Sequence, residues 1–199
     1  TASVWKQEVY FETRIKLEGE LTARVEPGTV AYWPPGRAIC LFYGLSQPYS
    51  PVLRLGRIVG PLFCLSWIEE GEDVEVVEYE DYGDAGDVAK KLREEGILAA
   101  SRSWEDAMSV VVLMDDFRAE VFVEKYGFPV ESDALFLTDN SVLTKAAIKA
   151  VAEAVGGEVR VDVNEEGHLI LSAFAEDFDE LVKTLRTMER AWRRAEEAI

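Results

Sequence analysis

The stretch from Pro27 to Ile68 limits the fold most strongly, because 42 consecutive residues include no Asp or Glu. The chain of 199 residues has 38 acidic and 21 basic side chains, so this stretch is an exception in a protein of net charge −17. It also holds six of the seven prolines, which together with glycines divide it into short apolar runs. Short apolar runs separated by Pro and Gly are typical of strands in a small barrel or sandwich. We therefore predict that the N-terminal half is mainly β.

Individual strands of this half follow from alternation and from turn signals. Apolar and charged side chains alternate near the N-terminus, as in half-buried strands, and Glu26-Pro27-Gly28-Thr29 has the composition of a tight turn. Pro34-Pro35-Gly36 separates two of the later runs, since proline cannot donate to a strand ladder. The predicted strands are residues 9–11, 15–17, 30–33, 38–43 and 53–59.

The same stretch carries three arginines and seven aromatic residues, which suggests a binding site. Aromatic walls with a few polar groups form pockets for small molecules or peptides, and guanidinium groups recognise carboxylates or phosphates. The alternative is that these aromatic residues fill the core of a β domain. Under the first interpretation the protein is a binding module for a small anionic or peptide-like ligand. Its predicted ligand-binding residues are Tyr32, Trp33, Arg37, Phe42, Tyr43, Tyr49, Arg54 and Arg57.

An acidic block separates the two halves of the chain. Residues 69–87 contain ten acidic and no basic side chains, and blocks of like charge are usually solvated. We predict a last strand at Val74–Val77, followed by an acidic linker at residues 81–87. This linker divides a first domain, residues 1–80, from a second, residues 88–199.

Cysteine and acidic residues offer little support for a metal or cofactor. Cys40 and Cys64 lie in apolar runs, where a free Cys behaves as a small hydrophobe; a disulfide between them is the alternative. The chain has one His and no CxxC spacing, so we predict no metal site. A calcium site at Asp81, Asp84 and Asp87 would lack the usual loop pattern. No Walker or dinucleotide fingerprint is present, and no cofactor is predicted.

Charge and hydropathy also exclude classes of partner. A chain this acidic repels a phosphate backbone, so we expect no nucleic-acid partner. No apolar run approaches the roughly 18–20 residues of a membrane span. No signal-peptide pattern is visible, which predicts a cytoplasmic protein. Scarce amides beside abundant charged residues suggest a thermophilic archaeal or bacterial host.

The second half has the mixed patterns of an α+β domain. Predicted helices cover residues 88–95, capped by Asp87, 142–155, capped by Ser141, and about 176–195. Apolar residues at spacings of three and four give the last helix one apolar face. Docking of this face on a partner, including a second copy of the chain in a homo-oligomer, is an alternative function. The face consists of Phe178, Leu181, Leu185, Met188 and Trp192.

Hairpins are predicted between these helices. Residues 110–114 and 117–123 favour two strands turning at Asp115-Asp116, with one long helix as the alternative. Residues 158–163 and 168–174 predict a second hairpin. Ser103 followed three residues later by Asp106 resembles a capping box and predicts a helix start.

Particular segments of the first half resemble a known family. The run from Gly28 to Gly44, which contains Tyr32-Trp33-Pro34-Pro35-Gly36, is similar to the small prokaryotic cyclophilin-like family. Trp5–Glu12, Tyr49–Val52 and Gly56–Gly60 extend the resemblance, which covers residues 1 to about 80. It implies a closed β-barrel of the cyclophilin type, without an established activity.

Two departures from the family pattern leave alternatives open. Family members usually begin earlier, with a strand hairpin and a helix, and the segment 158–190 is a candidate replacement. A circular permutation of the barrel is therefore an alternative. The resemblance also makes a prolyl isomerase-like enzyme an alternative function. However, residues 1–80 contain no His, which isomerases of this fold place along the peptide groove, so the catalytic residues are unknown.

Overall fold

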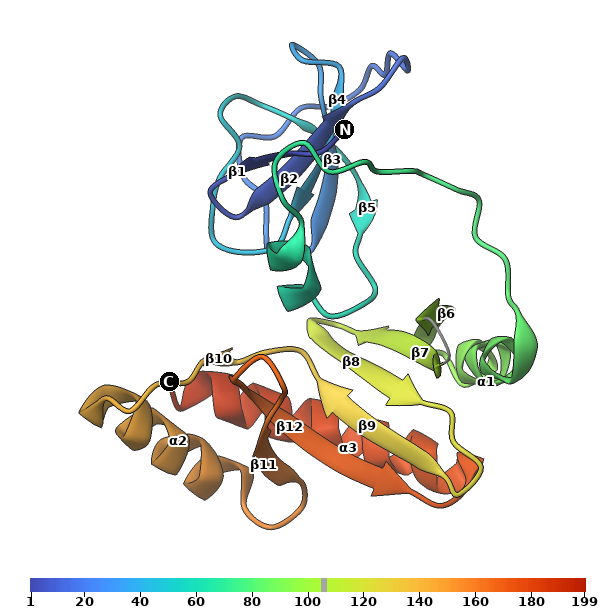
Figure 1. Cartoon of the computed structure of the whole chain (residues 1–199), viewed down its shortest axis with the longest axis vertical. Helices are drawn as coiled ribbons and strands as arrows, with labels where there is room; N and C mark the ends of the chain where they lie inside the picture. The colour runs from blue at the N-terminus through green and yellow to red at the C-terminus, as the bar shows by residue number, and fades with distance from the viewer. Residues whose placement is uncertain (105–106) are drawn as a thin grey trace. The chain divides into compact units, whose positions relative to one another are not determined.

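The chain contains two compact units. The computed structural model describes residues 1–104 and 107–199. The first unit consists of residues 1–58 and 62–79, and the second of residues 59–61 and 80–199 (Figure 1).

The first unit is a five-stranded antiparallel sheet with the order β1-β2-β4-β3-β5. Tight turns join β1 to β2 and β3 to β4, and Lys6 and Arg37 adopt positive φ angles of 56° and 47° in these turns. A short 3₁₀ helix, η1, follows the sheet. The bounds are β1 Ser3–Trp5, β2 Glu8–Glu12, β3 Thr29–Trp33, β4 Ala38–Phe42, β5 Leu53–Arg57 and η1 Phe63–Trp67.

The sheet of the first unit is open, so the prediction of a closed barrel from the family resemblance is wrong. Within the described residues, β1 pairs only with β2 and β5 only with β3, so the sheet stays open at these two edges. The predicted strand at residues 15–17 is also wrong. These residues form an irregular segment whose Ile15 carbonyl accepts a hydrogen bond from the Tyr32 hydroxyl.

The core of the first unit follows the period of two expected of strands. On β4, Ala38, Cys40 and Phe42 are buried, while the alternate side chains are half-buried. Cys40 and Phe42 pack with Val25, Ala31 and Val52. Aromatic residues of the predicted site therefore take part in this core, as the alternative interpretation expected.

The start of the acidic block pairs with the N-terminal strand. The backbone N–H of Gly71 donates to Ala2, and Ala2 donates to Glu72. The Glu70 carboxylate accepts the N–H of Val4 at 2.6 Å. The strand predicted at Val74–Val77 is wrong, because this segment joins no ladder and its valines at 76 and 77 are exposed.

The second unit is a seven-stranded antiparallel sheet with three helices. Its main order is β10-β12-β9-β8-β7-β6, and β11 pairs with β12. Helix α1 packs against β6 and β7, and α3 packs against β12 and α2. The bounds are α1 Gly83–Glu94, β6 Leu98–Trp104, β7 Ala107–Met114, β8 Phe117–Phe122, β9 Phe128–Ser132, β10 Phe136–Leu137, α2 Val142–Val155, β11 Arg160–Val163, β12 His168–Ala175 and α3 Phe178–Glu197.

Both predicted hairpins of the second unit are confirmed. β7 and β8 turn at Asp115, which has a φ of 51°, so the long-helix alternative is wrong. β11 and β12 turn at Gly167, and β12 also pairs with β9 and β10. The circular permutation finds no support, because these strands pair within the second sheet. Ser103 lies in β6 rather than at a helix start, and Asp106 lies outside the described residues.

The starts of two of the three helices agree with those predicted from the sequence. Ser141 caps α2, and its hydroxyl accepts the N–H of Thr144 at 3.1 Å. Helix α3 begins after Asp177, close to the predicted start. Helix α1 begins at Gly83, so Asp87 lies inside the helix and is not its cap.

The apolar face of α3 lies in the core of the second unit. Leu181, Leu185 and Met188 are completely buried, and Trp192 is 6% exposed. Trp192 packs against Phe117, with ring centroids 6.1 Å apart. The prediction that this face docks on a partner is wrong, because the sheet of its own unit covers it.

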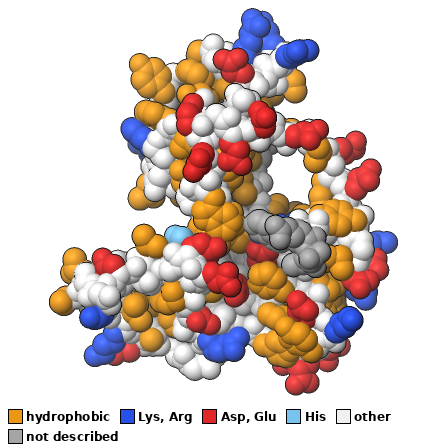
Figure 2. Space-filling view, in the orientation of Figure 1, with side chains coloured by type: hydrophobic (Ala, Val, Ile, Leu, Met, Phe, Trp, Pro, Cys, Tyr) orange, Lys and Arg blue, Asp and Glu red, His pale blue; other side chains and the backbone are white. Residues whose placement is uncertain are grey.

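Acidic side chains are spread over both units on the face shown in Figure 2, where basic side chains occur in small groups. Across the described parts of the chain, no helix is long and apolar enough to cross a membrane. The described Asp81, Asp84 and Asp87 form no cluster that could hold a metal ion, so the calcium alternative finds no support.

Candidate ligand-binding pocket

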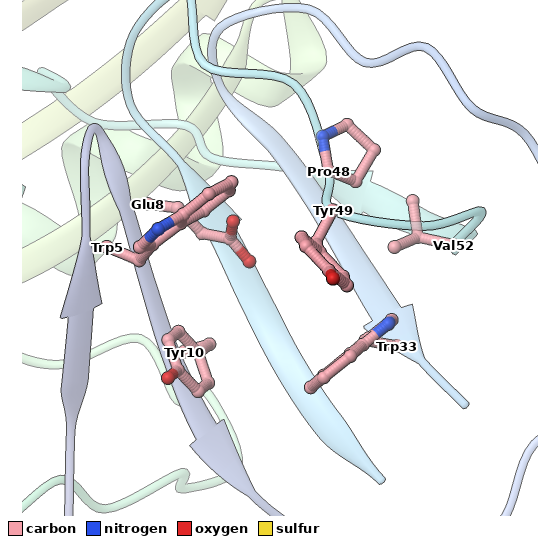
Figure 3. Close-up of a pocket in the computed structure, with 7 residues that line it drawn as sticks. All are labelled: Trp5, Glu8, Tyr10, Trp33, Pro48, Tyr49 and Val52. Carbon is pink, nitrogen blue, oxygen red and sulfur yellow. The ribbon is translucent and has the colours of Figure 1, made fainter. Parts of the chain in front are cut away.

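A pocket of about 230 Å³ lies in the first unit. Side chains from β1, β2, β3 and the loop 45–52 surround it (Figure 3). Four of them are aromatic, and one is a carboxyl group. The lining residues are Trp5, Glu8, Tyr10, Trp33, Pro48, Tyr49 and Val52.

Strand pairing brings these side chains to one face of the sheet. Glu8 and Tyr10 are two residues apart on β2, so both project from the same face. Trp5 on β1 lies directly opposite Glu8. On the next strands Tyr10 pairs with Cys40, which in turn pairs with Ala31, and Trp33 lies two residues beyond Ala31.

The aromatic rings are held in defined orientations. Trp5 and Tyr49 meet edge to face, with centroids 6.3 Å apart and planes at 82°. The indole N–H of Trp33 donates to the Ser50 hydroxyl at 2.7 Å. Gly36 leaves room for this indole, because a Cβ atom at that position would overlap the ring.

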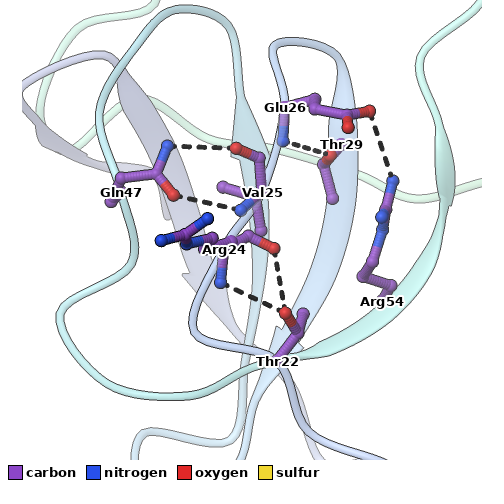
Figure 4. A network of polar contacts seen from close by, with 7 residues as sticks. All are labelled: Thr22, Arg24, Val25, Glu26, Thr29, Gln47 and Arg54. Carbon is purple, nitrogen blue, oxygen red and sulfur yellow. Dashed lines mark hydrogen bonds and ion pairs between the residues drawn. The ribbon is translucent and has the colours of Figure 1, made fainter.

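The Gln47 side chain holds the loop that carries Pro48 and Tyr49. Its amide oxygen accepts the backbone N–H of Val25 at 3.1 Å, and its amide nitrogen donates to the Val25 carbonyl at 3.0 Å (Figure 4). Val25 therefore donates and accepts one hydrogen bond each with Gln47, as two paired residues do in an antiparallel ladder. At the other end of the loop, Val52 exchanges two backbone hydrogen bonds of 2.9 Å with Thr22.

The segment that receives Gln47 is itself fixed by local polar contacts. The Thr22 hydroxyl bonds to the backbone N–H and carbonyl of Arg24, and Thr29 accepts the N–H of Glu26 (Figure 4). Hydrogen bonds between the loop 45–52 and residues 22–29 therefore hold the side of the pocket formed by Pro48 and Tyr49.

Glu8 is an ionisable group in an apolar place. It is 6% exposed, and its carboxyl group forms a hydrogen bond with the Cys40 thiol. Burial raises the pKa of Glu8 above its usual value of 4.5, and the hydrogen bond from Cys40 opposes part of this rise. Perturbed carboxyl groups in clefts are candidates for function.

The cysteines do not form the alternative disulfide. Neither Cys40 nor Cys64 is joined in a disulfide bond. Burial raises the pKa of Cys40, and the neighbouring Glu8 carboxyl adds to the rise. Cys40 is therefore a poor nucleophile, because reactivity requires the thiolate.

Two of the predicted aromatic residues, Trp33 and Tyr49, line the pocket. Phe42 is completely buried in the core. Tyr32 is also buried, with its hydroxyl bonded to the Ile15 carbonyl. The Tyr43 hydroxyl donates to the Lys6 carbonyl, and partial burial raises its pKa.

The predicted arginines lie elsewhere. Arg37 is exposed in the β3–β4 turn and borders a different hollow, which Tyr32 also lines. Arg54 and Arg57 are exposed on β5, and Arg54 pairs with Glu26 at 3.7 Å. None of the seven lining residues is an arginine or a histidine. The structure thus does not gather the predicted aromatic and guanidinium groups into this pocket.

Sequence reasoning missed Trp5, Glu8, Tyr10, Pro48 and Val52 as pocket residues. Glu8 and Tyr10 precede the acid-free stretch on which the prediction concentrated. Their signal was the alternation of Glu8, Val9 and Tyr10, since a buried Val9 on one face places the other two on the opposite face.

The first unit is thus a small antiparallel β module with an aromatic pocket on one face of its sheet. Residues 1–77 match the family model described as Cyclophilin-like, so this segment is a cyclophilin-like domain. The resemblance noted in the sequence is thereby confirmed. No curated protein matches the chain.

Proposed function

We propose that the first unit is a binding module whose pocket receives a small organic group or the side chain of a peptide. The observation that carries this proposal is the set of aromatic rings around one cavity. Trp5, Tyr10, Trp33 and Tyr49 offer apolar surface, and Glu8 is the one acidic group among the lining residues. Concave apolar surfaces with few polar groups are typical of ligand sites.

The arrangement of the rings also supports binding rather than simple core packing. Tyr49 is 84% exposed although it contacts Trp5. An aromatic side chain left open to water beside a cavity gains by covering its surface with a ligand. The hydrogen bonds of Trp33 and Gln47 hold the walls in place without a ligand, which lowers the entropy cost of binding.

Indole N–H signals in NMR spectra test this proposal. We would titrate the full chain with three probes: tetramethylammonium, pivalate and a blocked proline dipeptide. Binding in the pocket shifts the signals of Trp5 and Trp33, which Trp5→Phe and Trp33→Phe variants assign. Trp67, outside the pocket lining, provides the internal control.

A probe that shifts the pocket signals in the wild type but not in Trp33→Ala supports the binding module. Circular dichroism would show that the variant is folded. Shifts confined to other parts of the chain, or no shift with any of the three classes of probe, would overturn the proposal.

A further inference from the structure

If the pocket is a binding site, as proposed above, the carboxyl group of Glu8 in its lining restricts the class of ligand. We infer that the pocket selects an alkylated ammonium group, carried by a small organic cation or by a methylated lysine side chain. The aromatic rings would contact the alkyl groups, and Glu8 would supply the countercharge.

The rings provide the first part of this argument. The face of an aromatic ring is electron-rich and attracts cations, most strongly in tryptophan. Trp5, Tyr10, Trp33 and Tyr49 come from four different segments and surround one space (Figure 3). Several rings around one cavity form the type of cage that recognises quaternary ammonium groups.

Glu8 provides the second part. Its carboxyl group projects into the pocket between Trp5 and Tyr49 (Figure 3). The lining contains no Lys, Arg or His that would neutralise it. A buried carboxylate is costly unless a positive charge or hydrogen bonds compensate it. A cationic ligand would supply this charge, whereas an anionic ligand would add a second negative charge beside Glu8.

An ammonium group of the chain already contacts one of the aromatic rings that line the pocket. The Lys6 Nζ atom lies 4.2 Å from the centroid of the Trp5 ring. This is a favourable cation–π distance. One ring of the pocket is therefore already engaged by a cation from the β1–β2 turn.

Proton binding is coupled to ligand binding in this arrangement. Cys40 on β4, Tyr10 on β2 and Tyr49 in the loop face Glu8, and Lys6 lies over Trp5. A bound cation favours the ionised form of Glu8. Affinity for the cation should therefore rise as pH rises through the pKa of Glu8.

The affinities of choline and of its carbon isostere, in which carbon replaces the quaternary nitrogen, should be compared. The two ligands have the same shape, so a difference in affinity reports the effect of the positive charge. Pivalate provides an anion with a similar tert-butyl group. We expect choline to bind about tenfold more tightly than the isostere, and Glu8→Gln to reduce this difference to the part that the aromatic rings contribute. The same variant should change affinity for the isostere little, because no charge interaction is lost.

The results separate the inference from the proposed function. Equal binding of choline and the isostere, or tighter binding of pivalate, would overturn the cation inference and leave a binding module. Failure of all probes to shift the Trp5 and Trp33 signals would overturn both. A Trp33→Ala variant checks that choline binds in this pocket.

A peptide with trimethyllysine, compared with its unmodified form, identifies the source of the cation. Preference for the methylated peptide over choline assigns a protein ligand, and the reverse assigns a small molecule. In either case, weaker binding of the preferred cation by Glu8→Gln than by the wild type supports the inference. Equal binding of methylated and unmodified peptides, with no response to choline, would contradict it.

Discussion

The carboxyl group of Glu8 and the thiol of Cys40 form a hydrogen bond between neighbouring strands, and both side chains are almost completely buried. Cys40 is 1% exposed, and Glu8 is 6% exposed. A strand that places an acid beside a thiol in its core loses stability relative to an apolar pair. Such a cost is common at sites that bind ligands.

Glu8→Gln should therefore stabilise the protein at neutral pH. The pKa of Glu8 is higher in the folded chain than its usual value of 4.5, so the folded state binds more protons there than the unfolded state. Stability then falls as pH rises from about 4.5 through the folded pKa. Glutamine cannot ionise, and its amide oxygen still accepts the Cys40 bond.

Chemical denaturation of both proteins between pH 4 and pH 8 measures this effect. The stability difference in favour of Glu8→Gln should be smallest below pH 4.5 and should grow with pH. Glu12→Gln, at the exposed end of the same strand, is the matched control. A difference that is constant with pH would show that Glu8 is not the group responsible.

Gly36→Ala should disturb the pocket through Trp33. A methyl group at this position overlaps the indole ring, so the ring or the turn has to move. Overpacking of this type costs about 1–3 kcal/mol. Gly56→Ala is the control, because a Cβ atom there has no neighbour within 4 Å.

Thermal unfolding and choline titration of the two variants provide the comparison. Gly36→Ala should lower both stability and affinity, and Gly56→Ala should change neither by much. Equal effects of the two substitutions would mean that the position of Trp33 is unimportant for the site.

Tyr49→Ala should weaken ligand binding with little loss of stability. The ring is 84% exposed and contributes one wall of the pocket. Leu45→Ala is the control in the same loop, because Leu45 is 82% exposed and lies outside the pocket lining. We expect about a tenfold loss of choline affinity for Tyr49→Ala alone, measured by calorimetry. A similar loss in both variants would indicate a general change in the loop.

Cys64 should react with thiol reagents faster than Cys40 in the folded protein. Cys64 is partly exposed, whereas Cys40 is buried and its pKa is raised. Mass spectrometry of single-cysteine variants, Cys64→Ser and Cys40→Ser, measures each rate. Rapid modification of Cys40 without unfolding would contradict the burial that holds Glu8 in place.

Local patterns predicted the elements better than the arrangement of the site. The caps and periodicity of α2 and α3, and the β-branched run of β7, depend on neighbours in sequence and were read correctly. Helix α1 begins five residues before its predicted start, because its N-terminal residues have the acidic composition of a linker. Trp33 and Tyr49 are predictable because both are aromatic residues of the acid-free stretch.

Other features depend on pairing between distant segments. The burial of Glu8 follows from the register that places β2 beside β4, and the support from Gln47 follows from its contact with Val25. The arginines share the acid-free stretch with the aromatic residues, but strand alternation and turns direct them elsewhere. Composition alone therefore suggested an anionic ligand where the assembled pocket presents a carboxyl group.

Trp192→Ala should destabilise the second unit rather than dissociate an assembly. The indole is 6% exposed and packs on Phe117, so its removal leaves a cavity in the core. Loss of a buried Trp costs about 3–5 kcal/mol, whereas Lys183→Ala, at an exposed position on α3, should stay within about 0.5 kcal/mol of the wild type. Denaturant unfolding measures both values, and light scattering measures the mass of each variant. If Trp192→Ala keeps its stability but has a smaller molar mass in solution than the wild type, the apolar face of α3 holds an assembly together. That outcome would contradict the packing described above.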